Sequence, residues 1–247
     1  MGPTALRHFT EIDSTNAEAH RLAARGEAGP LWLVADRQTA GRGRLGRHWI
    51  SEPGNLYATI LFTITAPSPV VGQVSFPAAL AVHETAASVL PKGADGLAIK
   101  WPNDVLLGGA KFAGILAETL NQNADGTITL AIGFGINIAH APQGTPYPVT
   151  TLAQRGANVA PMDLHVVLAK ALTKWLAAWD EGRGFDAVRR EWLSRASGLG
   201  RTFAATSGRT ALSGAFVGLG DDGAMILELA DGSRRAVHSG EVRLAAQ

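Results

Sequence analysis

A segment rich in glycine and arginine, residues 38–49, constrains the fold of this chain most. Its sequence, QTAGRGRLGRHW, interleaves three glycines with three arginines. Glycine accepts positive φ and lets backbone approach a ligand, whereas clustered arginines repel one another. We expect a loop that orders when an anion binds between the arginines. It matches neither a P-loop nor a Rossmann turn, because arginines occupy the turn and His48-Trp49 stands where helix packing should begin. A solvated basic loop is the alternative.

The segments around this loop alternate between strand and helix patterns. Runs of aliphatic and β-branched residues predict strands at 31–37, 55–65, 97–101, 105–107, 111–120 and 127–138. Helices are predicted after residues 13–16, ending near Gly26, and at 70–90, 162–179 and 185–196. Gly108-Gly109 and residues 123–126 are turn signals between strands. The main domain is therefore predicted to be α+β, with a mixed, largely antiparallel sheet flanked by helices.

Local patterns add detail to three of the helices. Thr15 and Glu18 have the spacing of a capping box at a helix start. Pro77 must lie in the first turn of its helix or kink it. Trp175 and Trp179 are four residues apart, which predicts that both pack in the core.

The pattern of residues along the sequence changes at about Gly198. From there, short strand patterns alternate with Gly-Asp, Asp-Asp-Gly and Asp-Gly-Ser turns. This predicts a small β-barrel at residues 198–247 that follows a main domain at residues 1–197.

Composition excludes several classes of protein. The formal net charge of the 247 residues is only +1, which gives no reason to expect specific DNA binding. There are no cysteines, which excludes disulfides, thiolate metal sites and cysteine nucleophiles and is consistent with the cytoplasm. No segment reaches the ~18 apolar residues of a membrane span, and no signal peptide is recognisable. We expect a cytoplasmic protein without a membrane anchor.

Four further clusters combine charged or polar residues with glycine. Ser14-Thr15-Asn16 opens a helix, where free N–H groups and hydroxyls can bind a ligand or simply cap the helix. Residues 100–104, KWPND, place a lysine, an amide and a carboxylate around a turn, which could also be a solvated turn. Residues 111–118, KFAGILAE, and 133–138, GFGINI, put glycine inside strands, where another group can approach closely. Lys100 and Lys111 flank a predicted hairpin, so their side chains could converge.

Together these ordered motifs resemble one family, the biotin protein ligases or biotin–[acetyl-CoA-carboxylase] ligases. The resemblance rests on STN at 14–16, GRGRLGRHW at 41–49, KWPNDVLL at 100–107, KFAGILAE at 111–118 and GFGINI at 133–138. It implies ATP-dependent activation of biotin to biotinyl-5′-AMP, and transfer of biotin to one lysine of a biotin carboxyl carrier protein. It also implies that the C-terminal segment is a small SH3-like β-barrel.

The resemblance assigns residues to each substrate. For biotin it implies Ser14, Thr15, Asn16, Gln38, Gly41, Arg42, Gly43, Arg44, Lys111, Gly114 and Gly133. For the nucleotide it implies Arg44, Arg47, Trp49, Lys100, Asn103 and Asn137. The catalytic set is Lys111, Arg44, Lys100 and Asp104, in which fixed cations stabilise charge developing at phosphorus and no protein nucleophile is needed. Asp104 could help bind Mg²⁺, orient Lys100, or accept the proton of the carrier lysine. The glycine–arginine loop would be a lid over the adenylate.

Partners and rival functions follow from the same comparison. Carrier domains of acetyl-CoA carboxylase and related biotin-dependent carboxylases would be the protein substrates, and a homodimer is possible through an edge strand such as 55–65 or 127–138. Ser14 follows the start of the sequence too closely for an N-terminal DNA-binding module, so a form with ligase activity only is expected. The rival enzymes are lipoate–protein ligase and octanoyl transferase. A biotin sensor without turnover and a nucleic-acid binder are the rival non-enzymes.

Overall fold

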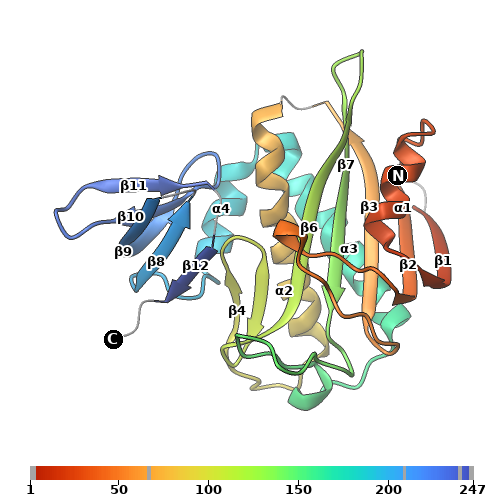
Figure 1. Ribbon diagram of the computed structural model, residues 1–247, viewed down its shortest axis with the longest axis horizontal. Helices are drawn as coiled ribbons and strands as arrows, with labels where there is room; N and C mark the ends of the chain where they lie inside the picture. The colour runs from red at the N-terminus through yellow and green to blue at the C-terminus, as the bar shows by residue number, and fades with distance from the viewer. Residues whose placement is uncertain (1–3, 66–67, 208–209, 239–240, 245–247) are drawn as a thin grey trace.

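A seven-stranded mixed sheet forms the centre of the main domain (Figure 1). The computed structural model describes residues 4–65, 68–207, 210–238 and 241–244. The strands are β1 (Ala5–Ile12), β2 (Leu31–Gln38), β3 (Leu56–Ile64), β4 (Leu97–Lys100), β5 (Asp104–Leu107), β6 (Ala110–Gln122) and β7 (Ile128–Ile136). Their order is β1-β2-β3-β7-β6-β5-β4, in which β1 and β2 are parallel and the other pairs are antiparallel. The predicted α+β class and the mixed, largely antiparallel sheet are confirmed.

The described residues form four α-helices, which cover the two faces of this sheet unequally. They are α1 (Thr15–Ala23), α2 (Ser75–Val89), α3 (Pro161–Trp179) and α4 (Phe185–Leu193), with 3₁₀ turns at η1 (Arg44–Gly46), η2 (Ser68–Val74), η3 (Ala153–Arg155) and η4 (Asp180–Gly182). The large core lies between the sheet and α2, α3 and α4, and contains Trp175 and Trp179 as predicted. Helix α1 packs on the opposite face in a small cluster with residues of β2, β3 and β7.

Alternation along β7 leaves room for a pocket on the α1 face. Leu130, Ile132 and Phe134 point into the large core, because successive residues of a strand face opposite sides. Ala131 packs under α1, and the next two positions on its side of the strand are Gly133 and Gly135. These two glycines leave room on this side of the strand for other groups to approach the sheet closely.

The N-terminal strand and the first helix cap differ from the sequence-based expectations. Strand β1 was not predicted, because nearly all its side chains are exposed and no apolar alternation marks it. The N-cap of α1 is Ser14, whose Oγ accepts from the Ala17 N–H at 3.4 Å, so the capping box expected at Thr15 is one residue too late. Pro77 lies in the first turn of α2, as expected.

The expectation about sheet edges is wrong. Strand β3 is hydrogen-bonded to β2 and β7, and β7 to β3 and β6, so neither 55–65 nor 127–138 is an edge. The outer strands are β1 and β4. The free side of β4 is partly covered, since Ile99 exchanges backbone hydrogen bonds with Arg195 and Ser197. Strand β1 is the more exposed of the two edges.

The C-terminal segment forms a second, smaller antiparallel sheet. Its strands are β8 (Thr202–Ser207), β9 (Thr210–Leu219), β10 (Met225–Glu228), β11 (Arg234–Val237) and β12 (Glu241–Leu244), in the order β11-β10-β9-β8-β12. It packs on the main domain through Phe216, whose ring lies 6.5 Å from that of Trp192. The Trp101 indole N–H also donates to the Gly223 carbonyl at 3.0 Å. The predicted small β domain is confirmed, while its exact boundary at residue 198 stays a prediction. Within the described residues, none of the helices is both long and apolar enough to cross a membrane.

Candidate functional site

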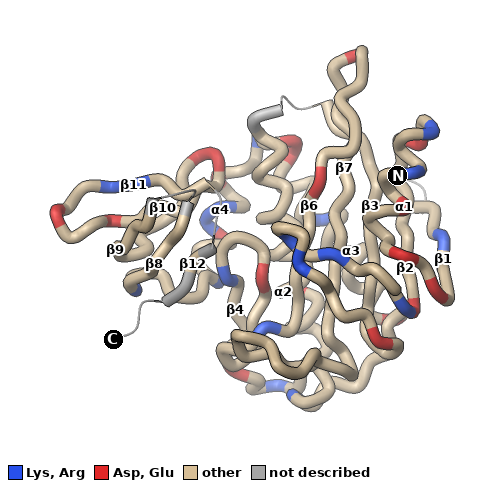
Figure 2. The backbone as a smooth tube through the Cα atoms, in the orientation of Figure 1, with Lys and Arg blue, Asp and Glu red and all other residues tan. Residues whose placement is uncertain are grey.

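A cavity of about 810 Å³ opens on the α1 face of the sheet, beneath the glycine–arginine loop. The loop crosses in front of the central strands and carries its basic residues there (Figure 2). Further lining comes from the start of α1, the end of β2, the β4–β5 turn, β6, β7, a loop at 143–148 and the small domain. Predicted site residues that line it are Ser14, Thr15, Asn16, Gln38, Arg42, Gly43, Arg44, Arg47, Trp49, Lys100, Asn103, Asp104, Lys111, Gly114 and Gly133.

One end of the cavity is built from hydrogen-bonding groups at the start of α1. The Gln38 Oε1 accepts from the backbone N–H of Thr15 at 2.8 Å, and its Nε2 donates to Ser51 Oγ at 3.0 Å. Thr15 Oγ1 lies 2.7 Å from Thr59 Oγ1. Because Ser14 and Thr15 are buried at 2% and 3% exposure, their hydroxyls are held in fixed positions at the cavity end.

The Asn16 amide forms part of the cavity floor, next to Thr15 and Gln38. It lies over Gly133, where an added Cβ would come within 2.1 Å of Asn16 Oδ1. Its Oδ1 accepts from Thr59 at 2.6 Å, and its Nδ2 donates to Glu118 Oε2 at 2.7 Å. Glycine is therefore required at position 133 to make room for a polar floor.

Trp49 lies flat against a glycine pair further along the cavity. Gly114 and Gly135 are cross-strand neighbours in β6 and β7. A Cβ on Gly135 would lie 2.4 Å from the Trp49 ring, and one on Gly114 would lie 2.9 Å from it. The sequence pattern indicated close approach to ligand at these glycines, and in this structure the group that approaches them is the indole of Trp49.

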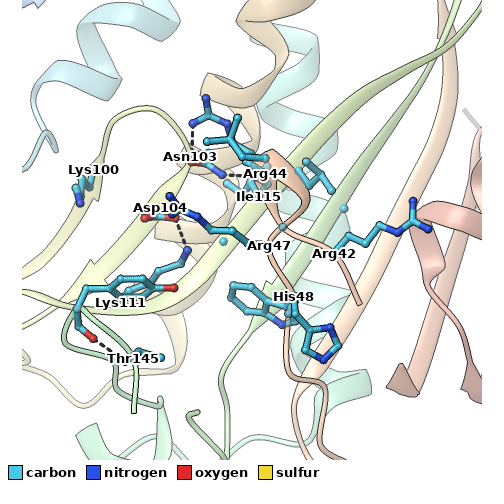
Figure 3. A pocket seen from close by; sticks show the side chains of 18 of the residues that line it. Arg42, Arg44, Arg47, His48, Lys100, Asn103, Asp104, Lys111, Ile115 and Thr145 are labelled. Atoms are coloured by element: carbon cyan, nitrogen blue, oxygen red, sulfur yellow. Dashed lines mark hydrogen bonds and ion pairs between the residues drawn. The ribbon is translucent and has the colours of Figure 1, made fainter. Parts of the chain in front are cut away.

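Lys111 stands at the meeting point of the loop segments (Figure 3). Its Nζ lies 2.6 Å from Asp104 Oδ1, and the two side chains are only 15% and 22% exposed. The same Nζ is 5.2 Å from the ring centre of Trp49 and 5.6 Å from that of Tyr147, distances typical of cation–π contacts. The sequence leaves three roles open for Asp104, one of which is to orient Lys100. In the structure the Asp104 carboxylate faces Lys111.

Arg44 anchors the loop to the β4–β5 turn. Its Nη1 donates to Asn103 Oδ1 at 3.2 Å, and Asn103 in turn donates to the Ile115 carbonyl at 2.6 Å. Burial lowers the pKa of the Arg44 guanidinium, while the charge of Asp104 raises it and that of Arg47 lowers it. Arginine remains charged at neutral pH even so. A partly desolvated cation facing the cavity is well suited to bind an anion.

Two predicted site residues lie behind the cavity wall instead of lining it. The Gly41 carbonyl accepts from the Trp49 N–H at 2.9 Å, and a Cβ on Gly41 would meet the Trp49 carbonyl at 2.6 Å. Asn137 is 2% exposed, and its backbone N–H donates to the Phe112 carbonyl at 2.8 Å. Gly41 thereby fixes the position of Trp49, which does line the cavity.

Sequence reasoning missed several lining residues. They include Ile50, Leu116, the loop at 143–148 with Tyr147, and Phe203 and Val242 of the small domain. The proline-rich pattern of 141–150 indicated a loop but not its place. A backbone hydrogen bond holds this loop at the cavity, because the Lys111 N–H donates to the Pro148 carbonyl at 2.9 Å.

Acidic groups are scarce in the cavity. Asp104 is the one carboxylate among the described lining residues. The described part of the chain holds no cluster of three or more His, Asp or Glu side chains placed to bind a metal. A single carboxylate fits Mg²⁺ that is held mainly by substrate phosphates, and does not form a resident metal site.

The chain matches known proteins over nearly its whole length. The model of the biotin/lipoate A/B protein ligase family matches residues 9–137, and that of the biotin protein ligase C-terminal domain matches residues 198–244. The biotin–[acetyl-CoA-carboxylase] ligase of Paracoccus denitrificans is 40% identical over 240 residues, 95% of this chain and 98% of that protein.

Solved structures agree with these matches. The biotin protein ligase of Aquifex aeolicus in complex with biotin and ATP is 28% identical, with a TM-score of 0.80 over 98% of this chain and 99% of that one. The Leishmania major ligase in complex with biotinyl-5-AMP is 26% identical, with a TM-score of 0.68 over 95% and 99%. Since the first family model covers more than half of the chain, the chain belongs to the biotin/lipoate A/B protein ligase family.

Proposed function

We propose that the protein activates biotin with ATP to biotinyl-5′-AMP and then transfers biotin to one lysine of a biotin carboxyl carrier protein. The observation that carries this proposal is one cavity with a neutral hydrogen-bonding end, at Thr15 and Gln38, and a cationic end, at Lys111 and Arg44. Biotin has the same division, with a neutral ureido ring at one end and a carboxylate at the other. The relatives named above are ligases of this kind.

The neutral end offers both donors and acceptors to a ureido ring. Ser14 Oγ accepts from the Ala17 N–H, so its own proton is available to donate. One N–H of Gln38 Nε2 is taken by Ser51, and the second is available to the ligand. Thr15 Oγ1 can accept from a ligand N–H. A ring with one carbonyl and two N–H groups would use all three residues.

The cationic end suits attack of a carboxylate on a phosphate. A carboxylate oxygen of biotin attacks the α-phosphorus, the bond to the β-phosphate oxygen breaks, and pyrophosphate leaves. Lys111 and Arg44 would hold both anions together and stabilise the charge added at phosphorus, with Lys100 facing the same space. Apposition of two anions is otherwise unfavourable, so fixed cations with few competing waters are the main requirement.

Asp104 serves each step differently in this proposal. It holds the Lys111 ammonium in place at 2.6 Å before activation. With ATP bound, Asp104 is the residue that would hold Mg²⁺, which would neutralise charge on the phosphates. In the transfer step the carrier lysine must lose a proton to attack the adenylate carbonyl, and Asp104 would accept it. The lysine nitrogen then bonds to the biotinyl carbon, and AMP leaves.

The glycine–arginine loop would act as the lid over the adenylate. Leu45 and Gly46 have φ of 59° and 71°, so the loop makes a sharp turn within its basic stretch. Arg42, Arg47 and the exposed Leu45 contribute to the lining of the cavity. A closed lid would exclude water from an anhydride that water hydrolyses.

The proposal extends to partners. Carrier domains of biotin-dependent carboxylases would present their lysine at the cavity mouth, and the exposed edge β1 would be the surface for pairing with a second copy of the chain. The net charge of +1 gives no electrostatic basis for specific DNA binding.

Biotin-dependent exchange of labelled pyrophosphate into ATP tests the proposed reaction. We expect exchange with biotin, none without it, and biotinylation of one lysine when a carrier domain is added. Lipoate should not replace biotin and should not compete with it. Exchange driven by lipoate would favour the related lipoate ligase activity, and binding of biotin without exchange would indicate a sensor.

A further inference from the structure

A chain of four polar side chains runs from the cavity end to a carboxylate outside the cavity. Gly133 lies between Thr59 of β3 and Leu116 of β6 in the sheet. The Asn16 amide lies over this glycine and bridges its neighbours, with Oδ1 at 2.6 Å from Thr59 and Nδ2 at 2.7 Å from Glu118. Thr59 in turn contacts Thr15 at 2.7 Å. Thr59, Thr15 and Asn16 are 0%, 3% and 6% exposed, so water does not complete their bonding.

The carboxylate of Glu118 fixes the direction in which Asn16 bonds. An ionised carboxylate only accepts hydrogen bonds, so the Asn16 amide must turn its NH₂ group toward Glu118. The Leu116 carbonyl, a second acceptor at 3.4 Å from Nδ2, favours the same orientation. Asn16 Oδ1 therefore faces Thr59 and needs a donor there.

Counting protons fixes the remaining bonds. Three short oxygen–oxygen contacts join Gln38 Oε1, Thr15 Oγ1, Thr59 Oγ1 and Asn16 Oδ1, at 3.1, 2.7 and 2.6 Å in that order. Only two hydroxyl protons are available for them. Thr59 can donate to Thr15 or to Asn16. Because Asn16 Oδ1 needs a donor, the Thr59 proton goes to Asn16, and Thr15 donates to Gln38 Oε1. Gln38 Oε1 accepts this proton together with that of the Thr15 N–H, which lies at 2.8 Å.

The result is a hydrogen-bond acceptor at the cavity end. Because the Thr15 proton points to Gln38 and the Thr59 proton is held by Asn16, the Thr15 oxygen offers a lone pair to the cavity and cannot offer a proton. We propose that Glu118 is a positioning residue for substrate recognition, which acts through Asn16 and Thr59 to make Thr15 an acceptor for a ureido N–H of biotin. Glu118 does not line the cavity itself. The inference rests on the proposed function for the identity of the ligand.

Glu118→Gln tests the chain, because an amide can either donate to Asn16 or accept from it and so no longer fixes the direction. Thr59→Val removes the relay hydroxyl with nearly the same shape, and Thr59→Ser keeps it. We expect the Kd of biotin to rise about 3- to 10-fold in Glu118→Gln and in Thr59→Val, the size of one misdirected hydrogen bond. The kcat at saturating biotin should stay within about twofold, since this end of the cavity is remote from the reacting atoms. Thr59→Ser should bind like the wild type.

The double variant separates this account from a general structural role. Glu118→Gln should add nothing to Thr59→Val if it acts through Thr59. Glu11→Gln, which removes a carboxylate from the exposed Arg37–Glu11 pair, is the matched control and should change nothing. Wild-type biotin affinity in Glu118→Gln, a loss in kcat alone, or additive losses in the double variant would each overturn the inference. Failure of the wild type to form biotinyl-5′-AMP would instead refute the proposed function.

Discussion

Replacing Gly135 with alanine would place a methyl group where the Trp49 indole lies. The new Cβ would be 2.4 to 2.6 Å from three atoms of the ring. Carbon atoms in contact prefer about 3.5–4.0 Å, so the ring must retreat by roughly 1 Å or more. Strand β7 is hydrogen-bonded on both sides and cannot yield, whereas Trp49 sits at the end of a loop. The indole would therefore leave its glycine pair and its position 5.2 Å from Lys111.

The expected consequence is faster loss of the adenylate, with little loss of fold stability. A cation–π contact contributes about 0.5–2 kcal/mol, which corresponds to a roughly 2- to 30-fold faster release of biotinyl-5′-AMP. The assay follows dissociation and hydrolysis of radiolabelled adenylate, with the midpoint of thermal unfolding measured beside it. Gly218→Ala is the matched control, because its added Cβ meets nothing within 4 Å. Retention equal to that of the wild type would refute the idea that Trp49 is part of the lid.

Three further perturbations have defined outcomes. Lys111→Ala should lower biotin-dependent pyrophosphate exchange by ~10²–10³-fold with an unchanged fold, as for loss of one group that stabilises transition-state charge; near-normal exchange would remove Lys111 from the reaction. Arg44→Gly should release adenylate that labels lysines of bystander proteins, and biotin should protect residues 39–48 of the wild type from protease; equal protection without biotin would mean that the loop is already ordered. Burial, with a smaller contribution from Arg195, lowers the pKa of His83 from 6.5 to about 4. The unfolded chain therefore takes up the proton first, and stability should fall as the pH drops from about 6.5 to 4, by less than the about 3 kcal/mol expected for a fully buried group, because solvent reaches part of His83. His83→Gln should lose this dependence in denaturant titrations at the two pH values.

Local sequence pattern predicted most elements, because their apolar residues repeat with the period of a strand or helix. Strand β1 was not predicted, because its side chains are mostly exposed and only its backbone pairing with β2 makes it a strand. The sheet edges were wrong because strand order depends on which strands pair, and a single sequence does not show that. Cap position was off by one residue, since both Ser14 and Thr15 are good N-cap residues.

Some features of the candidate site could also be predicted from local sequence, whereas others depend on how the strands pair. The glycine–arginine loop and both lysines could be found from residue type and spacing alone. The pairing of Asp104 with Lys111 could not, because it depends on the register of β5 and β6, which shifts between Val105 and Leu106. Glu118 lay within a motif already singled out, but its role depends on a contact with Asn16, 102 residues away in the chain.

Isotope transfer tests the central claim most directly, namely that this cavity joins the carboxylate of biotin to the α-phosphate of ATP. Biotin labelled with ¹⁸O in its carboxylate would be turned over with ATP and a carrier domain, and the AMP analysed by mass spectrometry. Attack of the carboxylate on phosphorus leaves one labelled oxygen bridging carbon and phosphorus, and attack of the lysine on carbon leaves that oxygen with AMP. The account predicts AMP that carries one ¹⁸O per biotin transferred. AMP without the label would contradict it.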